Sequence, residues 1–290
     1  MRAFINRHPL LTYYILTFAI SWGGILLVIG GPGGIPGTKE QFATQLPALI
    51  LAMLGGPSVA GILLTGLTGG MTGLRELFAR FRRWRVGFRW YAAALLTAPF
   101  VMTALPLAIS LRFPEFLPGI ITKSGKASLL LMGLVAGLMA GIFEELGWTG
   151  FAVPRLRRRY GVLATGLIAG GLWGAWHFLI NFWSSGSPSG ALSLDLLLHS
   201  VIFSVGILPA YRVLMVWVYD RAESLPIVTL MHLSLTAGNV ILVPLTITGL
   251  TGLIWSLVLA AAMWAVVLGV AAANRGRLSQ QPLRGQAIRL

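Results

Sequence analysis

The sequence contains no cysteine and unusually little charge. None of its 290 residues is cysteine, and Asp, Glu, Lys and Arg together make up only 10% of the chain. The first absence excludes disulfide bonds, a thiolate nucleophile and a cysteine-ligated zinc site. The second, combined with 56% hydrophobic residues and a mean hydropathy of +0.82, excludes a soluble globular domain of this length. The composition therefore predicts a polytopic membrane protein.

Long apolar segments divide the chain into predicted membrane spans. A helix needs about 20 apolar residues to cross roughly 30 Å of hydrocarbon. Eight such windows lie near residues 11–30, 47–67, 91–110, 128–150, 162–181, 195–218, 225–243 and 250–273. We therefore predict an all-α bundle of about eight transmembrane helices, forming a single domain over 1–274 with a functional core over 128–243. The basic tail 275–290 is predicted to be disordered.

Acidic residues are scarce, and the basic residues that outnumber them follow a pattern. The chain has 22 Lys and Arg against 8 Asp and Glu, which gives a net charge of +14. Eighteen of the 22 fall in segments predicted on one side of the membrane, as the positive-inside rule describes. Membrane orientation therefore explains the charge without a nucleic-acid partner. We expect a multi-pass protein of the plasma membrane, in contact with membrane lipids, with both termini in the cytoplasm.

The segment from Gly73 to Tyr91 interleaves aromatic and aliphatic residues with arginines. This pattern is typical of a helix that lies in the headgroup region, so we predict one interfacial amphipathic helix here. A solvated basic loop that only sets the topology is the alternative. At the amino terminus, the first apolar segment lacks a clear small-residue cleavage site, which favours a retained signal anchor.

Glu144 and Glu145 stand side by side in an otherwise apolar stretch. A charged side chain at the centre of a bilayer costs about 2.5 to 3.5 kcal/mol on the lowest scales, and ionisable residues at that depth are usually functional. Two neighbouring carboxylates in a low-dielectric site cannot easily both ionise, so one is expected to hold a proton. The pair is therefore suited to general acid or base chemistry.

A histidine from the next span is the predicted partner of this pair. Antiparallel pairing of Glu144 with His177 centres the intervening turn near residue 160, in a polar segment. In a competing register, two stripes of glycines pack against each other, which moves the turn to about Val153 and separates Glu144 from His177 by roughly 21 Å. We prefer the first register, with the glycines facing other helices. Glu144 and His177 could then orient and deprotonate a water molecule.

Span seven carries His232, Thr236 and Asn239 at i, i+4 and i+7, on one face of a helix. These three side chains could donate hydrogen bonds to an oxyanion. Two ionisable residues of span six receive structural interpretations instead. His199 is expected to make an interhelical hydrogen bond, and Arg212 to snorkel toward the inner interface.

The motifs around these residues resemble those of the CAAX-processing and bacteriocin-processing intramembrane proteases, the type II CAAX prenyl endopeptidase-like family. The first, two glutamates followed four residues after the second by arginine, is similar to Glu144-Glu145-Leu-Gly-Trp-Thr149. The second, an aromatic residue before histidine, is similar to Trp173-Gly-Ala-Trp-His177. The third, histidine followed by a small polar residue, is similar to the segment from His232 to Thr236. The resemblance covers about residues 70–240.

The resemblance implies a bundle of eight transmembrane helices and a role for each motif residue. Glu144 would activate water with His177, His232 would hold the oxyanion, and Glu145 would support the site. Thr149 and Trp173 are expected to be further support residues. No metal or other cofactor is required in this mechanism, although two histidines and a glutamate could bind zinc in principle.

This chain departs from the family pattern at three positions. Thr149 replaces the motif arginine, Trp173 replaces phenylalanine, and Thr236 replaces asparagine, a role that Asn239 could take. Loss of the arginine removes a countercharge, unless Arg155 or Arg212 substitutes for it.

The expected function is hydrolysis of a peptide bond in a peptide or membrane-anchored protein substrate. One alternative is a catalytically weak or inactive scaffold or immunity protein of the same fold, suggested by the missing motif arginine. Another is a proton-coupled carrier that uses the carboxylate pair.

Overall fold

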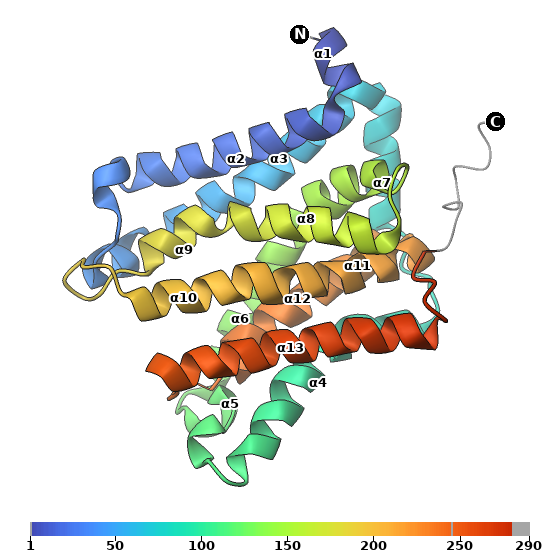
Figure 1. Cartoon of the computed structure of the whole chain (residues 1–290). Helices are drawn as coiled ribbons and strands as arrows, with labels where there is room; N and C mark the ends of the chain where they lie inside the picture. Colours follow the sequence, from blue (N-terminus) through green and yellow to red (C-terminus); the bar gives the residue numbers. More distant parts are fainter. Residues whose placement is uncertain (1, 245, 280–290) are drawn as a thin grey trace.

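The protein is a bundle of helices with eight long, apolar members, as seen in a computed structural model (Figure 1). The structure describes residues 2–244 and 246–279, and no strand is assigned within these ranges. Each predicted window coincides with one of the eight helices that are long and apolar enough to cross a membrane. The all-α membrane fold predicted from the sequence is therefore confirmed.

The spans are built from long helices, some of which are interrupted by short turns. The major helices are α2 (Pro9–Val28), α3 (Lys39–Phe81), α4 (Phe88–Ser110), α6 (Lys126–Gly147), α8 (Val162–Trp176), α11 (Leu208–Ala222), α12 (Leu225–Leu242) and α13 (Gly249–Ala273). The shorter elements are α1 (Arg2–Arg7), η1 (Pro32–Gly34), η2 (Pro114–Phe116), α5 (Gly119–Thr122), η3 (Trp148–Ala152), α7 (Val153–Leu156), α9 (Phe178–Ser184), α10 (Leu194–Ile202) and η4 (Phe203–Ile207). Both η3 and η4 are π-helical turns.

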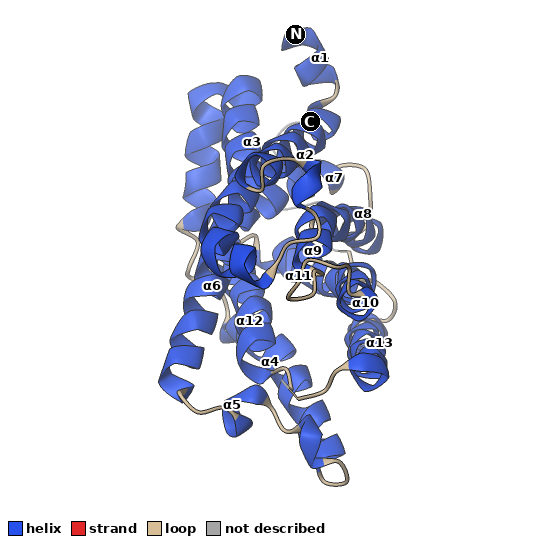
Figure 2. Cartoon of the chain, turned by 90° about the vertical axis from the view of Figure 1, so that its left-hand side faces the viewer, coloured by secondary structure: helices blue, strands red, loops and turns tan. Residues whose placement is uncertain are grey.

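The two glycine stripes do not pack against each other. Each packs against a different helix, as the preferred register predicts. Gly133, Gly137 and Gly141 of α6 lie against α12, which runs beside α6 in Figure 2. A Cβ at Gly141 would lie 2.7 Å from the Thr229 carbonyl oxygen, so only glycine allows this approach. The stripe of α8, Gly166, Gly170 and Gly174, lies against α11 and η4 in the same way. The turn between α7 and α8 falls at 157–161, close to the predicted residue 160.

Helix α3 is broken at Gly70, where φ is 59° and ψ is −155°. The following turns, residues 71–81, run steeply across the neighbouring helices at the right-hand end of the bundle in Figure 1. This segment lies where the interfacial helix was predicted. It ends at Phe81, earlier than expected, and residues 82–87 form an irregular connection to α4.

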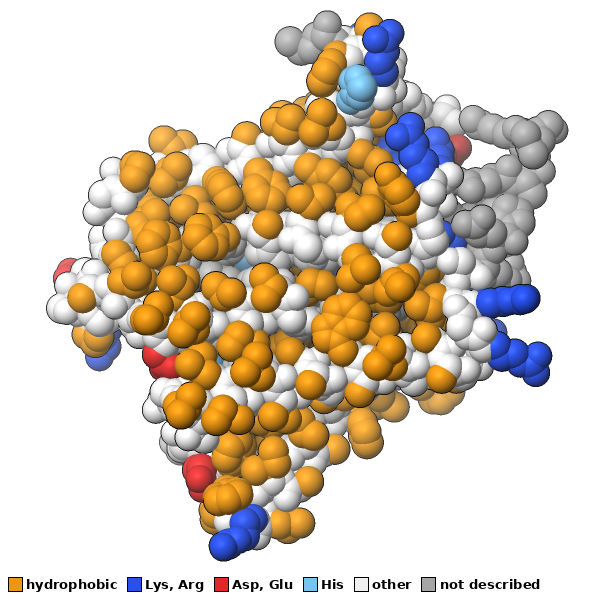
Figure 3. Space-filling model, in the orientation of Figure 1, with side chains coloured by type: hydrophobic (Ala, Val, Ile, Leu, Met, Phe, Trp, Pro, Cys, Tyr) orange, Lys and Arg blue, Asp and Glu red, His pale blue; other side chains and the backbone are white. Residues whose placement is uncertain are grey.

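The surface has an apolar belt and a basic end. Figure 3 shows hydrophobic side chains over most of one face, with Lys and Arg gathered mainly at its right-hand edge. We call the end of the bundle that holds the α3–α4 and α11–α12 connections the basic end; it carries Arg82, Arg83, Arg85 and Arg221. Residues 275–279 of the predicted tail fold back here, since the Ser279 hydroxyl accepts a hydrogen bond from Val162 N (2.8 Å). The rest of that tail lies outside the described residues.

Candidate active site

The two glutamates occupy the last turn of α6, directly before the π-helical turn η3. Both are buried, with exposed fractions of 3% for Glu144 and 0% for Glu145. Helices α3 and α2 both approach very closely at this point. A Cβ on Gly147 would collide with the Pro57 carbonyl oxygen of α3 and with the Tyr13 hydroxyl of α2. The Ser58 hydroxyl also donates to the Phe143 carbonyl oxygen (2.6 Å), which fixes the backbone just before the pair.

Glu145 is held by three side chains from three elements. Arg212 Nη1 of α11 donates to both of its carboxylate oxygens, at 2.9 and 2.8 Å. His232 Nδ1 of α12 lies 2.7 Å from Oε1. The Thr149 hydroxyl, one turn further along the same helix, donates to Oε2. Glu145 is therefore a fully bound carboxylate that ties three segments together.

Arg212 supplies the positive charge that Thr149 cannot. Its side chain is 0% exposed, so the prediction that it snorkels to the interface is wrong. The guanidinium carbon lies 4.0 Å from the centre of the Trp173 ring, a cation–π contact that strengthens as water is removed. A Cβ at Gly170 would approach Arg212 Cβ to 3.0 Å, so this glycine allows α8 and α11 to bring the two side chains together.

Glu144 is held far less tightly than its neighbour. The Trp173 indole N–H donates to Oε2 at 2.7 Å, and His232 Nε2 lies 4.0 Å from Oε1. No lysine or arginine side chain bonds to it within the described residues. Since His232 Nδ1 faces the Glu145 carboxylate, its Nε2 is directed toward the Glu144 side of the site. We call Glu144, Glu145, Trp173, Arg212 and His232 the carboxylate centre.

His177 lies beside the carboxylate centre without bonding to it. It occupies the junction between α8 and α9, where its Nδ1 donates to the Trp173 carbonyl oxygen at 2.8 Å. This bond leaves Nε2 free to accept. Among the described residues His177 makes no direct hydrogen bond to Glu144. Trp173 contacts both, because its ring centre is 5.8 Å from that of His177.

The two remaining predicted support residues lie apart from this network. Thr236 is half-buried one turn beyond His232 on α12, and Asn239 is exposed. Seven residues separate His232 from Asn239, which is about 10 Å along a helix axis. Neither Thr236 nor Asn239 joins the hydrogen bonds of the carboxylate centre in the described part of the chain. Their predicted role toward an oxyanion stays a prediction.

The sequence around these residues matches that of known proteases. Residues 126–238 match the family model described as Type II CAAX prenyl endopeptidase Rce1-like. The motif-bearing core is thus similar to this family. A 45-residue segment is 42% identical to CAAX prenyl protease 2 of Methanococcus maripaludis, and it covers 16% of this chain and 17% of that protein. The match thus spans less than a fifth of the curated relative's length.

This core also contains buried polar atoms that have no hydrogen-bond partner among the described residues. Arg212 Nε and Nη2 have no acceptor among the described residues, and the indole nitrogens of Trp148 and Trp176 have none either. The two indole rings touch, with centres 5.9 Å apart, and Trp176 is 4.8 Å from the His177 ring. Buried polar groups of this kind usually bind ordered water.

Sequence reasoning misplaced Arg212, although a signal was present. Arg212 lies ten residues before Ala222, the last residue of α11, which corresponds to about 15 Å along the helix. An arginine side chain is too short to reach the interface from that depth. Glu144 lies twelve residues before Leu156, the last residue of α7, so the two residues have similar depths. Comparing these depths would have favoured burial of Arg212 at the level of the glutamates over snorkelling to the interface.

Proposed function

We propose that the protein is an intramembrane endopeptidase in which Glu144 activates water for peptide-bond hydrolysis. The observation that carries the proposal is the unequal binding of the two glutamates. Glu145 is bound by Arg212, His232 and Thr149, whereas Glu144 has one hydrogen bond. Glu144 is therefore the carboxylate with oxygen lone pairs available for a water molecule. The Rce1-like family match supports a protease role in general.

In the proposed reaction, Glu144 accepts a proton from a water molecule that also donates to His177 Nε2. The water oxygen attacks the carbonyl carbon of the scissile amide, whose oxygen becomes an oxyanion. A protonated His232, held at Nδ1 by Glu145, donates from Nε2 to that oxyanion. Glu144 then passes its proton to the amide nitrogen, the C–N bond breaks, and a carboxylic acid and an amine leave.

The polar side chains around the centre fit this reaction in a membrane. The unpartnered nitrogens of Arg212, Trp148 and Trp176 are suited to hold water next to His177. Glu145 already binds a guanidinium, an imidazole and a hydroxyl, which favours a metal-independent, glutamic-type mechanism. We propose a peptide or membrane-anchored protein as substrate. The basic end would face the cytoplasm from the plasma membrane, as the positive-inside rule predicts.

The decisive experiment compares wild-type protein with Glu144→Gln. Purified full-length protein is reconstituted in liposomes and supplied with peptides that carry a prenyl or acyl anchor, and cleavage is followed by mass spectrometry. General acid–base catalysis contributes about 10² to 10⁴ in rate, so Glu144→Gln should lose activity by that factor. Glu115→Gln is the matched control, because Glu115 is exposed and lies 29 positions before Glu144 in the chain. This variant should retain full activity.

Two outcomes would contradict the proposal. Full cleavage by Glu144→Gln and by His177→Ala would exclude the assigned roles. If no peptide were cleaved and the cellular function did not depend on Glu144, the scaffold alternative would be favoured. The metal question has its own measurement. Activity should survive stringent chelation. If chelation removed the activity and only zinc restored it, the metal-independent mechanism would be wrong.

The substrate can be sought at the same time in living cells. Membrane proteomes of cells that express wild-type protein or Glu144→Gln are compared for shortened protein termini. A true substrate should appear as a truncated chain only when the Glu144 carboxylate is present.

A further inference from the structure

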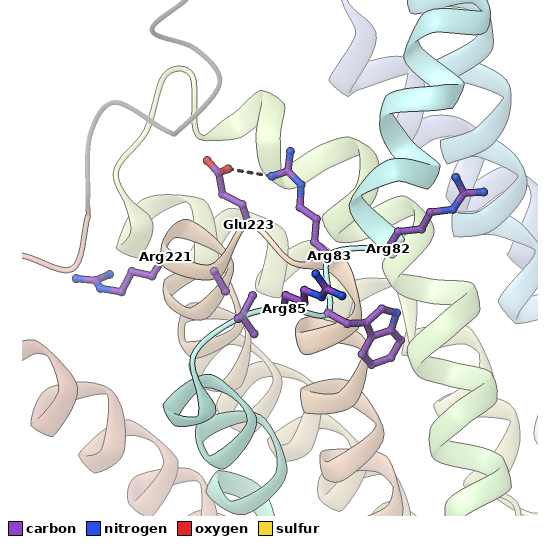
Figure 4. A pocket seen from close by; sticks show the side chains of 8 residues that line it. Arg82, Arg83, Arg85, Arg221 and Glu223 are labelled. Carbon is purple, nitrogen blue, oxygen red and sulfur yellow. Dashed lines mark hydrogen bonds and ion pairs between the residues drawn. The ribbon is translucent and has the colours of Figure 1, made fainter.

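A second site lies at the basic end, outside the carboxylate centre. The connection between α3 and α4 and the turn between α11 and α12 enclose a cavity of about 520 Å³ (Figure 4). Four arginines line it, namely Arg82, Arg83, Arg85 and Arg221, together with a single carboxylate, Glu223. Nothing in the proposed hydrolysis uses these residues.

The cavity has a large excess of positive charge. Four arginines against one glutamate leave a net charge of +3. Arg83 forms an ion pair with Glu223, at 3.0 Å. Arg221 donates to neutral acceptors, the Leu278 carbonyl oxygen at 2.5 Å and Asn274 Oδ1 at 3.1 Å. Arg82 and Arg85 make no ion pair with the described residues. The site therefore favours an anionic ligand.

The cavity lies where helices of membrane-spanning length begin and end. It sits where α3 ends at Phe81, α4 begins at Phe88, α11 ends at Ala222 and α12 begins at Leu225. All four helices are long and apolar enough to cross the membrane. Trp84 in the cavity wall is 51% exposed, and Phe88, the first residue of α4, is 84% exposed. Exposed aromatic rings at helix ends are typical of the membrane interface.

We propose that this cavity binds the phosphate of an anionic phospholipid headgroup. Guanidinium groups bind phosphate oxygens through charge-assisted hydrogen bonds. In Figure 4, Arg82 and Arg221 point to opposite sides. The cations are thus spread around the cavity, as suits a headgroup that is larger than a single phosphate. Trp84, Val86 and Ala222 add an apolar wall, which suits a lipid better than a small free anion.

The test measures lipid binding by the full-length protein in detergent, using native mass spectrometry. Phosphatidylglycerol and phosphatidylcholine are titrated separately, and phosphatidylglycerol should bind more tightly. Each arginine near an anionic headgroup contributes about fivefold to binding. Arg85→Gln should therefore weaken phosphatidylglycerol binding about fivefold, and Arg82→Gln/Arg85→Gln about thirtyfold. Glu223→Gln removes the carboxylate and should strengthen binding.

Arg75→Gln is the matched control. Arg75 is an exposed arginine on the adjoining segment 71–81, and it does not line the cavity. It should leave binding within twofold of wild type. Weakening equal to that of Arg85→Gln would show a diffuse surface charge and overturn the site, as would equal binding of phosphatidylcholine. A further arm adds inorganic phosphate or glycerol phosphate at millimolar concentration. Displacement of the lipid by either would assign the cavity to a soluble anion.

Discussion

Two buried ion pairs connect α11 to the segment that begins with the glutamates, and the two pairs differ in their hydrogen bonds. Glu145 with Arg212 and Arg157 with Asp220 are each 0% exposed in their side chains. Arg157 donates from Nε (3.0 Å) and Nη2 (2.6 Å) to Asp220, and from Nη1 to the Tyr160 carbonyl oxygen. All three nitrogens of Arg157 therefore have an acceptor.

Arg212 is bonded through one nitrogen alone. Nη1 binds Glu145, whereas Nε and Nη2 find no acceptor among the described residues. A buried donor without a partner costs about 1 to 3 kcal/mol, so such an arrangement is poor as a purely structural device. The comparison teaches that Arg157 completes a structural contact, while Arg212 keeps hydrogen-bonding capacity beside the proposed catalytic water.

The largest effect is expected from Arg212→Met. Removing one partner of a buried pair leaves an uncompensated charge and costs about 3 to 5 kcal/mol of stability. Glu145 and His232 would also shift, and a displacement of about 1 Å in an active site can cost a hundredfold in rate. Thermal unfolding and peptide cleavage by the same reconstituted sample measure both losses.

A companion variant separates position from charge. Thr149→Arg in the Arg212→Met background returns a guanidinium to the motif position, one helical turn from Glu145. It should recover at least tenfold of the lost activity. Failure to recover activity in a well-folded double variant would mean that the place of Arg212 on α11, and not its charge alone, is required.

Arg157→Met should destabilise the protein nearly as much but spare the chemistry. The expected loss is again about 3 to 5 kcal/mol, with a turnover rate per folded molecule close to that of wild type. The double variant Arg157→Met/Asp220→Leu replaces both charges by apolar groups and should restore most of the melting temperature. A turnover rate that fell with Arg157→Met, even below the melting transition, would erase the contrast between the two pairs.

Thr149→Val has the smallest expected effect. It removes one of the hydrogen bonds to Glu145 and leaves those from Arg212 and His232 in place. A single interhelical or side-chain bond of this kind contributes about 1 kcal/mol. The melting temperature should fall slightly and the cleavage rate should stay within about threefold. A hundredfold loss would instead give Thr149 a direct part in the reaction.

The eight spans and the packing of the glycine stripes followed from the sequence, because both depend on local properties. Span length and hydropathy are set by the thickness of the membrane, and small residues at regular spacing mark close helix contacts. The partner of Glu145 could not be found in this way. Which helix faces Glu145 depends on how α6, α11 and α12 are arranged around one another, and the pattern within one helix does not contain that arrangement.

The sequence separated span two, ending near residue 67, from the interfacial segment that begins at Gly73, and the break at Gly70 lies between them. The end of the interfacial segment at Phe81 was missed. The motif spacing brought His177 to the vicinity of Glu144 and placed Trp173 among the residues expected to support the site, but it did not predict the hydrogen bond from Trp173 to Glu144.

The π-helical turn after the glutamates has a mechanical consequence. Such a turn leaves carbonyl groups outside the regular α-helical pattern, and here the Gly150 carbonyl oxygen accepts a hydrogen bond from Arg80 Nη2 at 2.8 Å. Arg80 belongs to segment 71–81, and its Nη1 also binds the Tyr219 hydroxyl of α11 at 3.0 Å. A single guanidinium thus clamps the surface segment to both helices that carry the Glu145–Arg212 pair. A shift of this segment would therefore be transmitted through Arg80 to the backbone five residues from Glu145.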